Sequence, residues 1–123
     1  MDRVSVAGLG GVVLFADHAD QLAHWYERNL GIFFTREPDS HHWWADLPGG
    51  VSFAIHQSKH PLGHDRRHCE ITWVVDDLDA FVEHLAEMGL TVDERQETSD
   101  GDFAWLDDPE GNRIELFQRR DGQ

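Results

Sequence analysis

The stretch "DDPEGNRIELFQ", residues 107–118, joins a tight-turn sequence to an alternating strand sequence. Asp, Pro, Gly and Asn favour turns, and successive side chains of a strand point to opposite faces. Ile114 and Leu116 therefore share one face. The other face carries Arg113, Glu115 and Phe117. A carboxylate placed between a cation and an aromatic ring is a candidate metal ligand, half of an ion pair, or a solvated edge residue.

Two helical segments indicate that the chain contains an internal repeat. "LAHWYERNLG" (22–31) and "DDLDAFVEHLAEMG" (76–89) both place apolar residues at helical spacing, and both end at a glycine. Each helix is preceded by a run rich in strand formers and followed by alternating segments with a turn. These flanking segments are residues 11–16 and 43–57 in the first half, and residues 70–75 and 104–118 in the second. The pattern predicts a duplicated β-α-β-β-β unit.

The duplication predicts the fold class and the organisation of the chain. Four strands and one helix in each half predict an α+β fold, with an eight-stranded mixed sheet and the helices on one face. We expect one domain over residues 1–123, in which the first repeat spans about 8–57 and the second about 69–118. The stretch 58–68, rich in Pro, Gly and charge, is expected to link them.

Composition and charge limit the classes of function. The chain has 123 residues, 40% of them hydrophobic, which is enough for a buried core. Its formal net charge of −14 argues against binding to nucleic acid or an anionic membrane and favours cationic ligands. Cys69 is the single cysteine, which excludes an internal disulfide and suits the cytoplasm. No apolar run reaches the roughly 18 residues that span a bilayer.

Three stretches together carry a family resemblance. The pattern "ADHADQLAHWYERNLG … VVDDLDAFVEHLAEMG … FAWLDDPEGNRIELF" resembles the glyoxalase/bleomycin-resistance/dioxygenase group, also called the vicinal oxygen chelate superfamily. The match runs from about Gly11 to Gln118, and "DPEGNRIEL" is its most specific part. The resemblance implies paired β-α-β-β-β modules whose sheet curls into a cup with the helices on the convex face, in a homodimer. It also implies a divalent metal on four inward-facing ligands in the enzymes, whereas resistance-type members bind drugs without a metal.

The resemblance assigns four ligand positions, and this chain fills two of them with carboxylates. Glu115 holds the last-strand position of the second half, and Glu70 holds its first-strand position. The corresponding positions of the first half hold Gly11 and Ala54, whose side chains cannot coordinate a metal. The chain therefore departs from the pattern of the metal-dependent members.

Period-two alternation from these four positions predicts which other side chains face the cup. The expected cup-facing residues with binding chemistry are Phe15 and His56 in the first half, and His68, Thr72, Arg113 and Phe117 in the second. The opposite face is apolar and is expected to pack against the helices. It consists of Val12, Leu14, Phe53, Ile55, Ile71, Trp73, Val75, Ile114 and Leu116.

Two carboxylates in one cavity repel each other unless a cation neutralises them. Arg113, a divalent metal or a cationic ligand would serve. The residues that would hold a metal are Glu70, Glu115, His56 and His68, a set suited to zinc, nickel, manganese or iron. Without a metal, we expect Arg113, water and Thr72 to satisfy Glu70 and Glu115.

Two classes of function follow from these residues. In an enzyme, the metal would act as a Lewis acid toward vicinal oxygens of a small substrate, and Glu115 or Glu70 would exchange protons. In a binding protein, the acidic aromatic cup would hold a cationic, partly planar molecule without chemistry. Trp44 and Trp105 occupy equivalent positions in the two halves. They either pack in the core or a dimer interface, or form an aromatic wall for the ligand.

Overall fold

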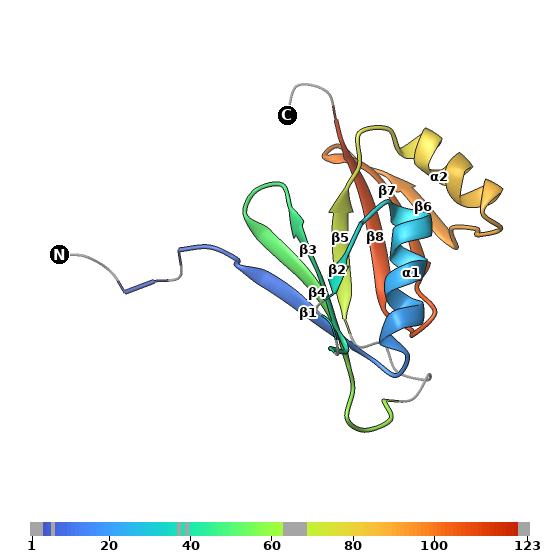
Figure 1. The fold of residues 1–123 in the computed structure, drawn as a ribbon. Coiled ribbons are helices and arrows are strands. Elements are labelled where there is room, and N and C mark those ends of the chain that lie inside the picture. The colour runs from blue at the N-terminus through green and yellow to red at the C-terminus, as the bar shows by residue number, and fades with distance from the viewer. Residues whose placement is uncertain (1–3, 6, 37, 39, 63–68, 121–123) are drawn as a thin grey trace.

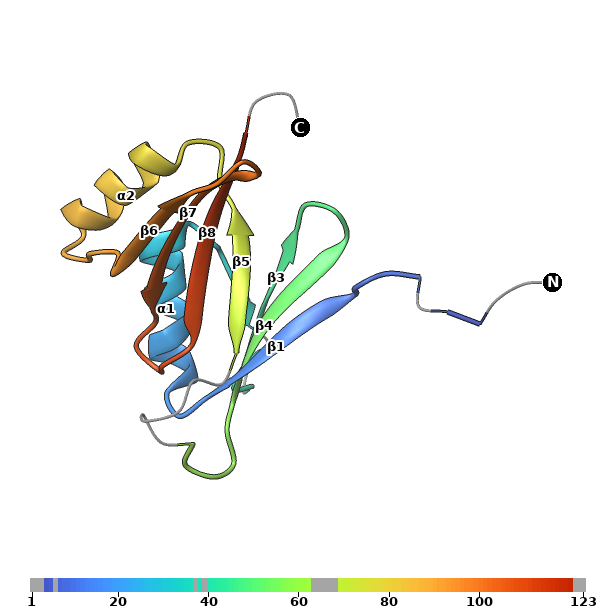
Figure 2. The same ribbon diagram turned by 180° about the vertical axis from the view of Figure 1, so that it is seen from behind.

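The computed structural model describes residues 4–5, 7–36, 38, 40–62 and 69–120. Two β-α-β-β-β units follow one another along the chain (Figures 1 and 2). The first unit comprises β1 (Gly11–Ala16), α1 (Ala19–Leu30), β2 (Thr35–Arg36), β3 (His42–Leu47) and β4 (Val51–Gln57). The second comprises β5 (Glu70–Val74), α2 (Leu78–Glu87), β6 (Glu94–Glu97), β7 (Gly101–Asp107) and β8 (Arg113–Arg119). The predicted duplication and α+β class are confirmed.

The eight strands form two four-stranded mixed sheets. The strand order is β1-β4-β3-β2 in the first sheet and β5-β8-β7-β6 in the second. In each sheet the first and last strands of the unit pair in parallel, and the other pairs are antiparallel. The helix between the first strand and the hairpin makes this parallel pairing possible, because parallel neighbours need a long crossover.

Each sheet has an inner face, which packs against the helices, and an outer face on its other side. The inner faces carry all nine side chains of the predicted apolar surface, and each of them belongs to the hydrophobic core or packs against it. Helix α1 lies in front of β7 and β8 in Figure 1 and behind them in Figure 2. The prediction that alternation separates a helix-packing face from a second face is therefore confirmed.

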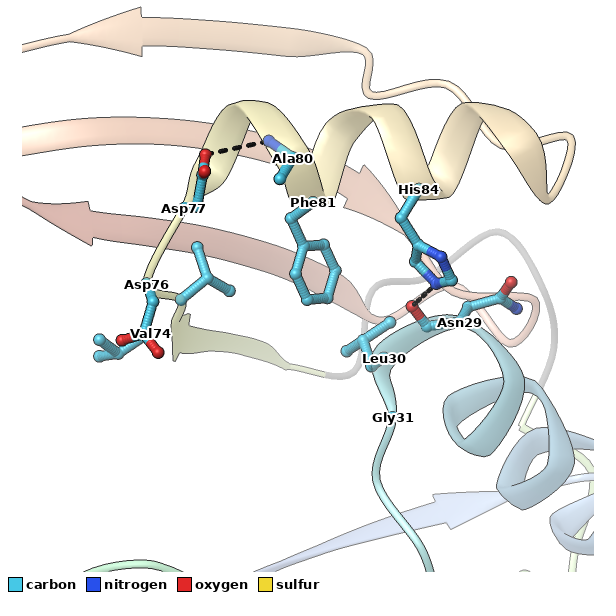
Figure 3. Close-up of a pocket in the computed structure, with 10 residues that line it drawn as sticks. Asn29, Leu30, Gly31, Val74, Asp76, Asp77, Ala80, Phe81 and His84 are labelled. Atoms are coloured by element: carbon cyan, nitrogen blue, oxygen red, sulfur yellow. Dashed lines mark hydrogen bonds between the residues drawn. The ribbon is translucent and has the colours of Figure 1, made fainter.

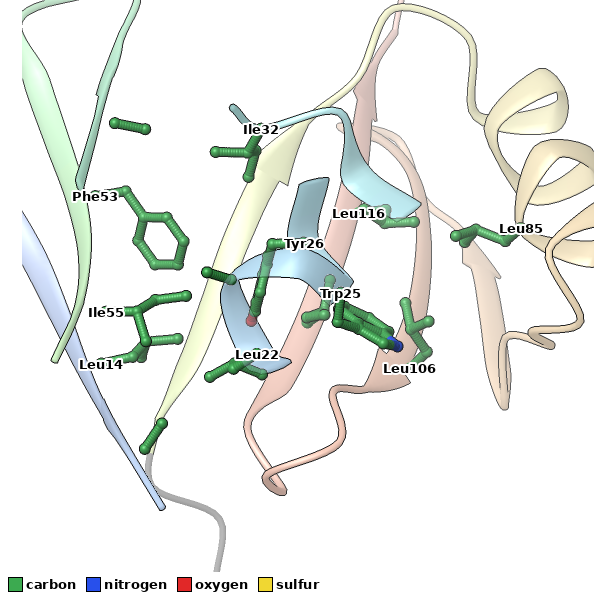
Figure 4. Close-up of a cluster of buried hydrophobic side chains, with 14 of the residues drawn as sticks. Leu14, Leu22, Trp25, Tyr26, Ile32, Phe53, Ile55, Leu85, Leu106 and Leu116 are labelled. Atoms are coloured by element: carbon green, nitrogen blue, oxygen red, sulfur yellow. The ribbon is translucent and has the colours of Figure 1, made fainter. Parts of the chain in front are cut away.

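Helix α1 lies between the inner faces of the two sheets. The Tyr26 ring lies 5.4 Å from the ring of Phe53 on β4 and 6.3 Å from that of Trp73 on β5, measured between centroids. Phe53 and Trp73 also contact each other, at 4.9 Å. Figure 4 shows Phe53 beside Tyr26 of α1, and Trp25 of the same helix beside Leu106 of β7. One core therefore joins the two modules.

Two equivalent glutamines hold the first turns of the helices. The Gln57 side-chain oxygen accepts a hydrogen bond from the Ala19 backbone N–H at 3.1 Å. The Gln118 side-chain oxygen accepts one from the Leu78 N–H at 2.7 Å. Each glutamine lies near the end of the last strand of its module, so that strand fixes the start of the helix. Helix α1 ends at Gly31, whose left-handed backbone (φ 71°) suits glycine.

The turn between β7 and β8 is built around Asp108, which is buried. Its Oδ1 accepts hydrogen bonds from the backbone N–H groups of Glu110 and Asn112, both at 2.9 Å. Its Oδ2 accepts from the Asn112 side chain at 3.0 Å and from the Tyr26 hydroxyl of α1 at 2.8 Å. Burial and the neighbouring Asp108 carboxylate raise the pKa of Tyr26 well above its usual value.

Glu110 extends this turn to the start of α1. Its Oε1 accepts from the Asp17 N–H at 2.9 Å, and its Oε2 accepts from the His18 N–H at 2.8 Å. His18 is the N-cap residue of α1 and has no side-chain capping bond of its own. The Glu110 carboxylate, from the second module, therefore takes the place of a side-chain cap at the start of α1 in the first module. The "DPEGN" stretch thus joins the two modules.

Candidate functional site

Glu115 lies at the centre of the outer face of the second sheet. The register pairs it with Thr72 of β5 on one side and with Trp105 of β7 on the other. Its Oε1 accepts a hydrogen bond from the Thr72 hydroxyl at 2.8 Å. Its Oε2 accepts one from the Trp105 indole N–H at 3.0 Å. The half-buried carboxylate is therefore held in one orientation by two neutral donors.

Three aromatic rings lie beside this carboxylate on the same outer face. Phe103 stacks on Trp105, with ring centroids 5.6 Å apart, and on Phe117 at 4.7 Å. The Arg119 guanidinium lies over the Phe117 ring, 5.8 Å from its centroid. We call Phe103, Trp105, Phe117 and Glu115 the aromatic face. Trp105 thus belongs to this face. The sequence alone did not decide whether Trp105 packs in the core or a dimer interface or lies in an aromatic wall for a ligand.

Phe103 was missed by the sequence reasoning, although a signal for it exists. It lies two residues before Trp105 in a strand, so alternation places both rings on one face. The register also sets Phe103 directly opposite Phe117, which the sequence does not show. Cross-strand neighbours of this kind are the pairs that stabilise a sheet and shape its surface.

Arg113 neutralises other acids than Glu115. The guanidinium makes two bonds to Asp93, at 2.6 and 2.7 Å, and one to Asp107 at 3.0 Å. Its Nη2 also lies 3.5 Å from Glu94. The hydrogen bonds that Arg113 donates to Asp93 are the main cause of the raised pKa of Arg113. The alternative in which Arg113 satisfies Glu115 is therefore wrong. The guanidinium bonds Asp93, just before β6, and Asp107, at the end of β7, instead.

Glu70 lies at the start of β5 and is exposed, with Arg113 as its neighbour in the register. Thr72 is also exposed and bonds Glu115, as the metal-free alternative expects. Glu70 and Glu115 are both on the outer face, as the alternation predicts. His68 lies outside the described residues.

The remaining predicted residues lie on the outer face of the first sheet. Phe15 and His56 are register partners, and their rings meet edge to face at 5.9 Å. His56 also stacks on His42, with centroids 3.9 Å apart. Burial, and secondarily His42, lower the pKa of His56. Trp44 is the register partner of Ala54 and lies on this face too, half-buried.

The candidate residues thus form two groups on two sheets. The inner faces meet through Tyr26, Phe53 and Trp73, so the outer faces point to different sides of one chain. Among the described residues, no hydrogen bond, ion pair or ring contact joins Phe15 or His56 to the aromatic face. A single chain therefore brings Glu115, Thr72, Trp105 and Phe117 together but keeps the first-sheet group apart from them.

A family model now places the chain among known proteins. The model described as "Glyoxalase-like domain" matches residues 11–117, nearly the whole described structure. The chain belongs to the glyoxalase-like domain family. Comparison with curated proteins found no match.

Solved structures of proteins named as glyoxalases or their relatives have the same fold. A putative glyoxalase family protein from Bacillus anthracis aligns with a TM-score of 0.78 at 20% identity, over 97% of this chain and 100% of that one. Lactoylglutathione lyase from Agrobacterium tumefaciens aligns with a TM-score of 0.73 at 14% identity, over 92% of this chain and 94% of that one. A glyoxalase/bleomycin resistance protein/dioxygenase from Nocardioides aligns with a TM-score of 0.74 at 17% identity, over 98% of this chain and 89% of that one. At these identities the likeness concerns the fold.

Glyoxalase-like proteins typically use a divalent metal, but the donor set of the described residues does not fit one. The register puts Gly11 and Ala54 on the outer face without a coordinating atom. Both oxygens of Glu115 already accept hydrogen bonds from neutral donors. Over the described ranges, no three His, Cys, Asp or Glu side chains lie close enough to hold one ion. A metal would have to displace Thr72 and Trp105 from Glu115, and the part of the chain that the structure describes would still not supply a full set of ligands.

Proposed function

We propose that this glyoxalase-like protein binds a small, cationic, partly planar molecule on its aromatic face and holds it without a resident metal. The observation that carries the proposal is the Glu115 carboxylate, fixed by Trp105 and Thr72 next to three stacked rings. The charge of the neighbouring Arg113 is already matched by Asp93 and Asp107. A cation on a bound ligand is a partner that suits this arrangement.

Electrostatics support a cation at this place. A positive charge is attracted to the faces of aromatic rings, and the attraction grows when water is excluded. The position of Arg119 over Phe117 shows that a guanidinium already fits against this surface. The net charge of −14 adds a long-range attraction for cations. The hydrogen bonds to Glu115 keep its charge oriented toward the rings, so less ordering is needed on binding.

We further propose that two copies of the chain complete the site as a homodimer. The outer faces expose apolar side chains, with Val13 at 43%, Phe15 at 54% and Val74 at 57% of full exposure. A two-fold axis would set the first-sheet face of one copy against the second-sheet face of the other, twice. Phe15, His56 and Trp44 would then face the aromatic face of the partner. This arrangement would cover the exposed side chains and enclose the ligand.

A titration with matched compounds tests the ligand class. We expect N-methylquinolinium to bind in isothermal titration calorimetry, and its uncharged analogue 1-methylnaphthalene to bind at least about fivefold more weakly. Glu115→Gln preserves the shape of the side chain and removes its charge, so it should weaken N-methylquinolinium about five- to tenfold. Glu83→Gln removes an equal charge from the exposed side of α2 and should leave binding unchanged. If both variants lost the same affinity for N-methylquinolinium, the loss would come from the change in net charge alone, and the proposal would be contradicted.

Elemental analysis tests the metal-dependent alternative. The purified protein should bind no stoichiometric zinc, nickel, manganese or iron between pH 6 and 8. A tightly held metal that disappears in Glu115→Ala would overturn the metal-free proposal and favour a metal-dependent enzyme. Calorimetric titration with each ion, on the wild type and Glu115→Ala, checks the same point independently.

A cytoplasmic location stays a prediction. None of the described helices is long and apolar enough to cross a membrane. Cys69 is half-buried, and burial raises the pKa of its thiol, so it is suited to remain reduced.

A further inference from the structure

We propose a second ligand site between the two sheets, for a small neutral molecule that carries one hydrogen-bond acceptor, such as an aryl ketone. A cavity of about 570 Å³ lies there. Inner-face side chains of both modules line it, among them Val12 and Phe53 from the first and Ile71, Trp73 and Leu116 from the second. Most of the lining is therefore on the helix side of the sheets. It also includes the outer-face residue Thr72, whose hydroxyl donates to Glu115, but Glu115 itself and the three rings of the aromatic face do not line it.

The lining of the cavity selects for a neutral, mostly apolar molecule. None of its lining residues carries a charge, and apart from Ser52, Thr72 and the indole N–H of Trp73 the side chains are apolar. A charged ligand would lose its hydration without gaining an ion pair, which is costly. The volume falls in the range of about 300–1,000 Å³ that is typical of small-molecule sites.

Trp73 supplies the polar contact. Its indole nitrogen is buried, and among the described residues it has no hydrogen-bond partner. Buried donors are nearly always paired in native proteins, because an unpaired one has lost its hydrogen bonds to water without replacing them. The Trp73 side chain lines the cavity, and a small shift of its ring would bring the buried N–H to the cavity wall. An acceptor on a bound molecule would then pair this donor, so the proposal favours a ligand with a carbonyl oxygen over a pure hydrocarbon.

A neighbouring hollow offers an entrance. It lies between the end of α1 and the start of α2, and it shares Leu30, Val74, Val75 and Phe81 with the cavity. Figure 3 shows Phe81 and Leu30 projecting into this space beneath α2. One hydrogen-bond contact there, His84 Nε2 to the Asn29 carbonyl oxygen at 3.2 Å, links the helices. A ligand can therefore enter from this side without opening a sheet.

Acetophenone and ethylbenzene make a matched pair of probes, because they share size and shape and differ in the carbonyl oxygen. We expect acetophenone to shift the Trp73 indole N–H resonance of the ¹⁵N-labelled full chain downfield, and ethylbenzene to leave that resonance without such a shift. Trp73→Phe removes the donor and should weaken acetophenone about tenfold, while ethylbenzene changes little. Trp43→Phe removes an indole outside the cavity and should affect neither compound.

The outcomes separate a ligand site from a packing defect. The proposal is overturned if acetophenone leaves the Trp73 resonance unchanged, or if Trp73→Phe weakens both compounds equally. Should Trp73→Phe fail to fold, the comparison of the two compounds on the wild-type resonance decides alone. Neither compound carries a charge, so a failure here leaves the cation site on the aromatic face untouched.

Discussion

At the scale of single residues, Glu110 does more than complete a turn. Its two oxygens accept the Asp17 and His18 N–H groups that would otherwise be unpaired at the start of α1. Glu110→Ala should therefore lower the free energy of unfolding by about 2 kcal/mol, because two part-buried donors lose their partner. Urea unfolding at fixed protein concentration measures the loss. Glu83→Ala, on the exposed side of α2, should change it by less than about 0.5 kcal/mol. Equal values for the two variants would contradict the capping role.

His56 makes a second prediction at the residue scale, and it concerns pH. Its folded-state pKa is lowered by burial and by His42, so the folded state binds this proton more weakly than the unfolded state does. The corresponding stability is complete above the ordinary value of about 6.5 and is lost as pH falls through the lowered pKa. NMR titration should place His56 below the ordinary value, and His42→Gln should raise it. A His56 pKa at or above 6.5 in the wild type would refute this.

At the scale of elements, the pairing of β7 with β8 depends on Gly101. A Cβ atom added there would collide with the Gln118 carbonyl oxygen and the Phe117 ring. Gly101→Ala should therefore lower the free energy of unfolding by about 1–3 kcal/mol, because backbone atoms cannot move aside. The shift of Phe117 should also weaken N-methylquinolinium.

Gly10→Ala is the matched control for this element, because a Cβ atom at Gly10 meets open space. Thermal unfolding of both variants at one concentration makes the comparison. If Gly101→Ala has the melting temperature of the wild type and binds N-methylquinolinium equally well, then the close approach of the two strands does not constrain this position.

At the scale of the whole molecule, the proposed dimer predicts a mass of twice 14.1 kDa by light scattering after size-exclusion chromatography. Phe15→Asp should produce the monomer, because a carboxylate would be buried without a partner in the interface. Phe33 is 78% exposed and belongs to no strand, since it lies in the loop between α1 and β2. Phe33→Asp should therefore remain dimeric. A monomeric wild type, or a Phe15→Asp variant that stays dimeric, would contradict the proposed arrangement.

Local pattern by itself determined the elements and their faces. Alternation and helical spacing act within a few residues, so they located β1, both helices and β8, and they separated Ile114 and Leu116 from Glu115. The internal repeat likewise predicted two equivalent modules. For the site, the sequence placed Glu115, Thr72 and Phe117 on one face, because strand geometry alone decides this.

The tertiary structure alone decided which partners these residues have. Arg113 bonds Asp93, twenty residues away, and Glu110 caps a helix of the other module. It also decided that Phe15 and His56 lie apart from Glu115 within one chain, since the modules meet through their inner faces. Such contacts depend on how distant segments pack and on which charged group lies nearest. That information is absent from any local pattern, whereas strand alternation is set by the backbone itself.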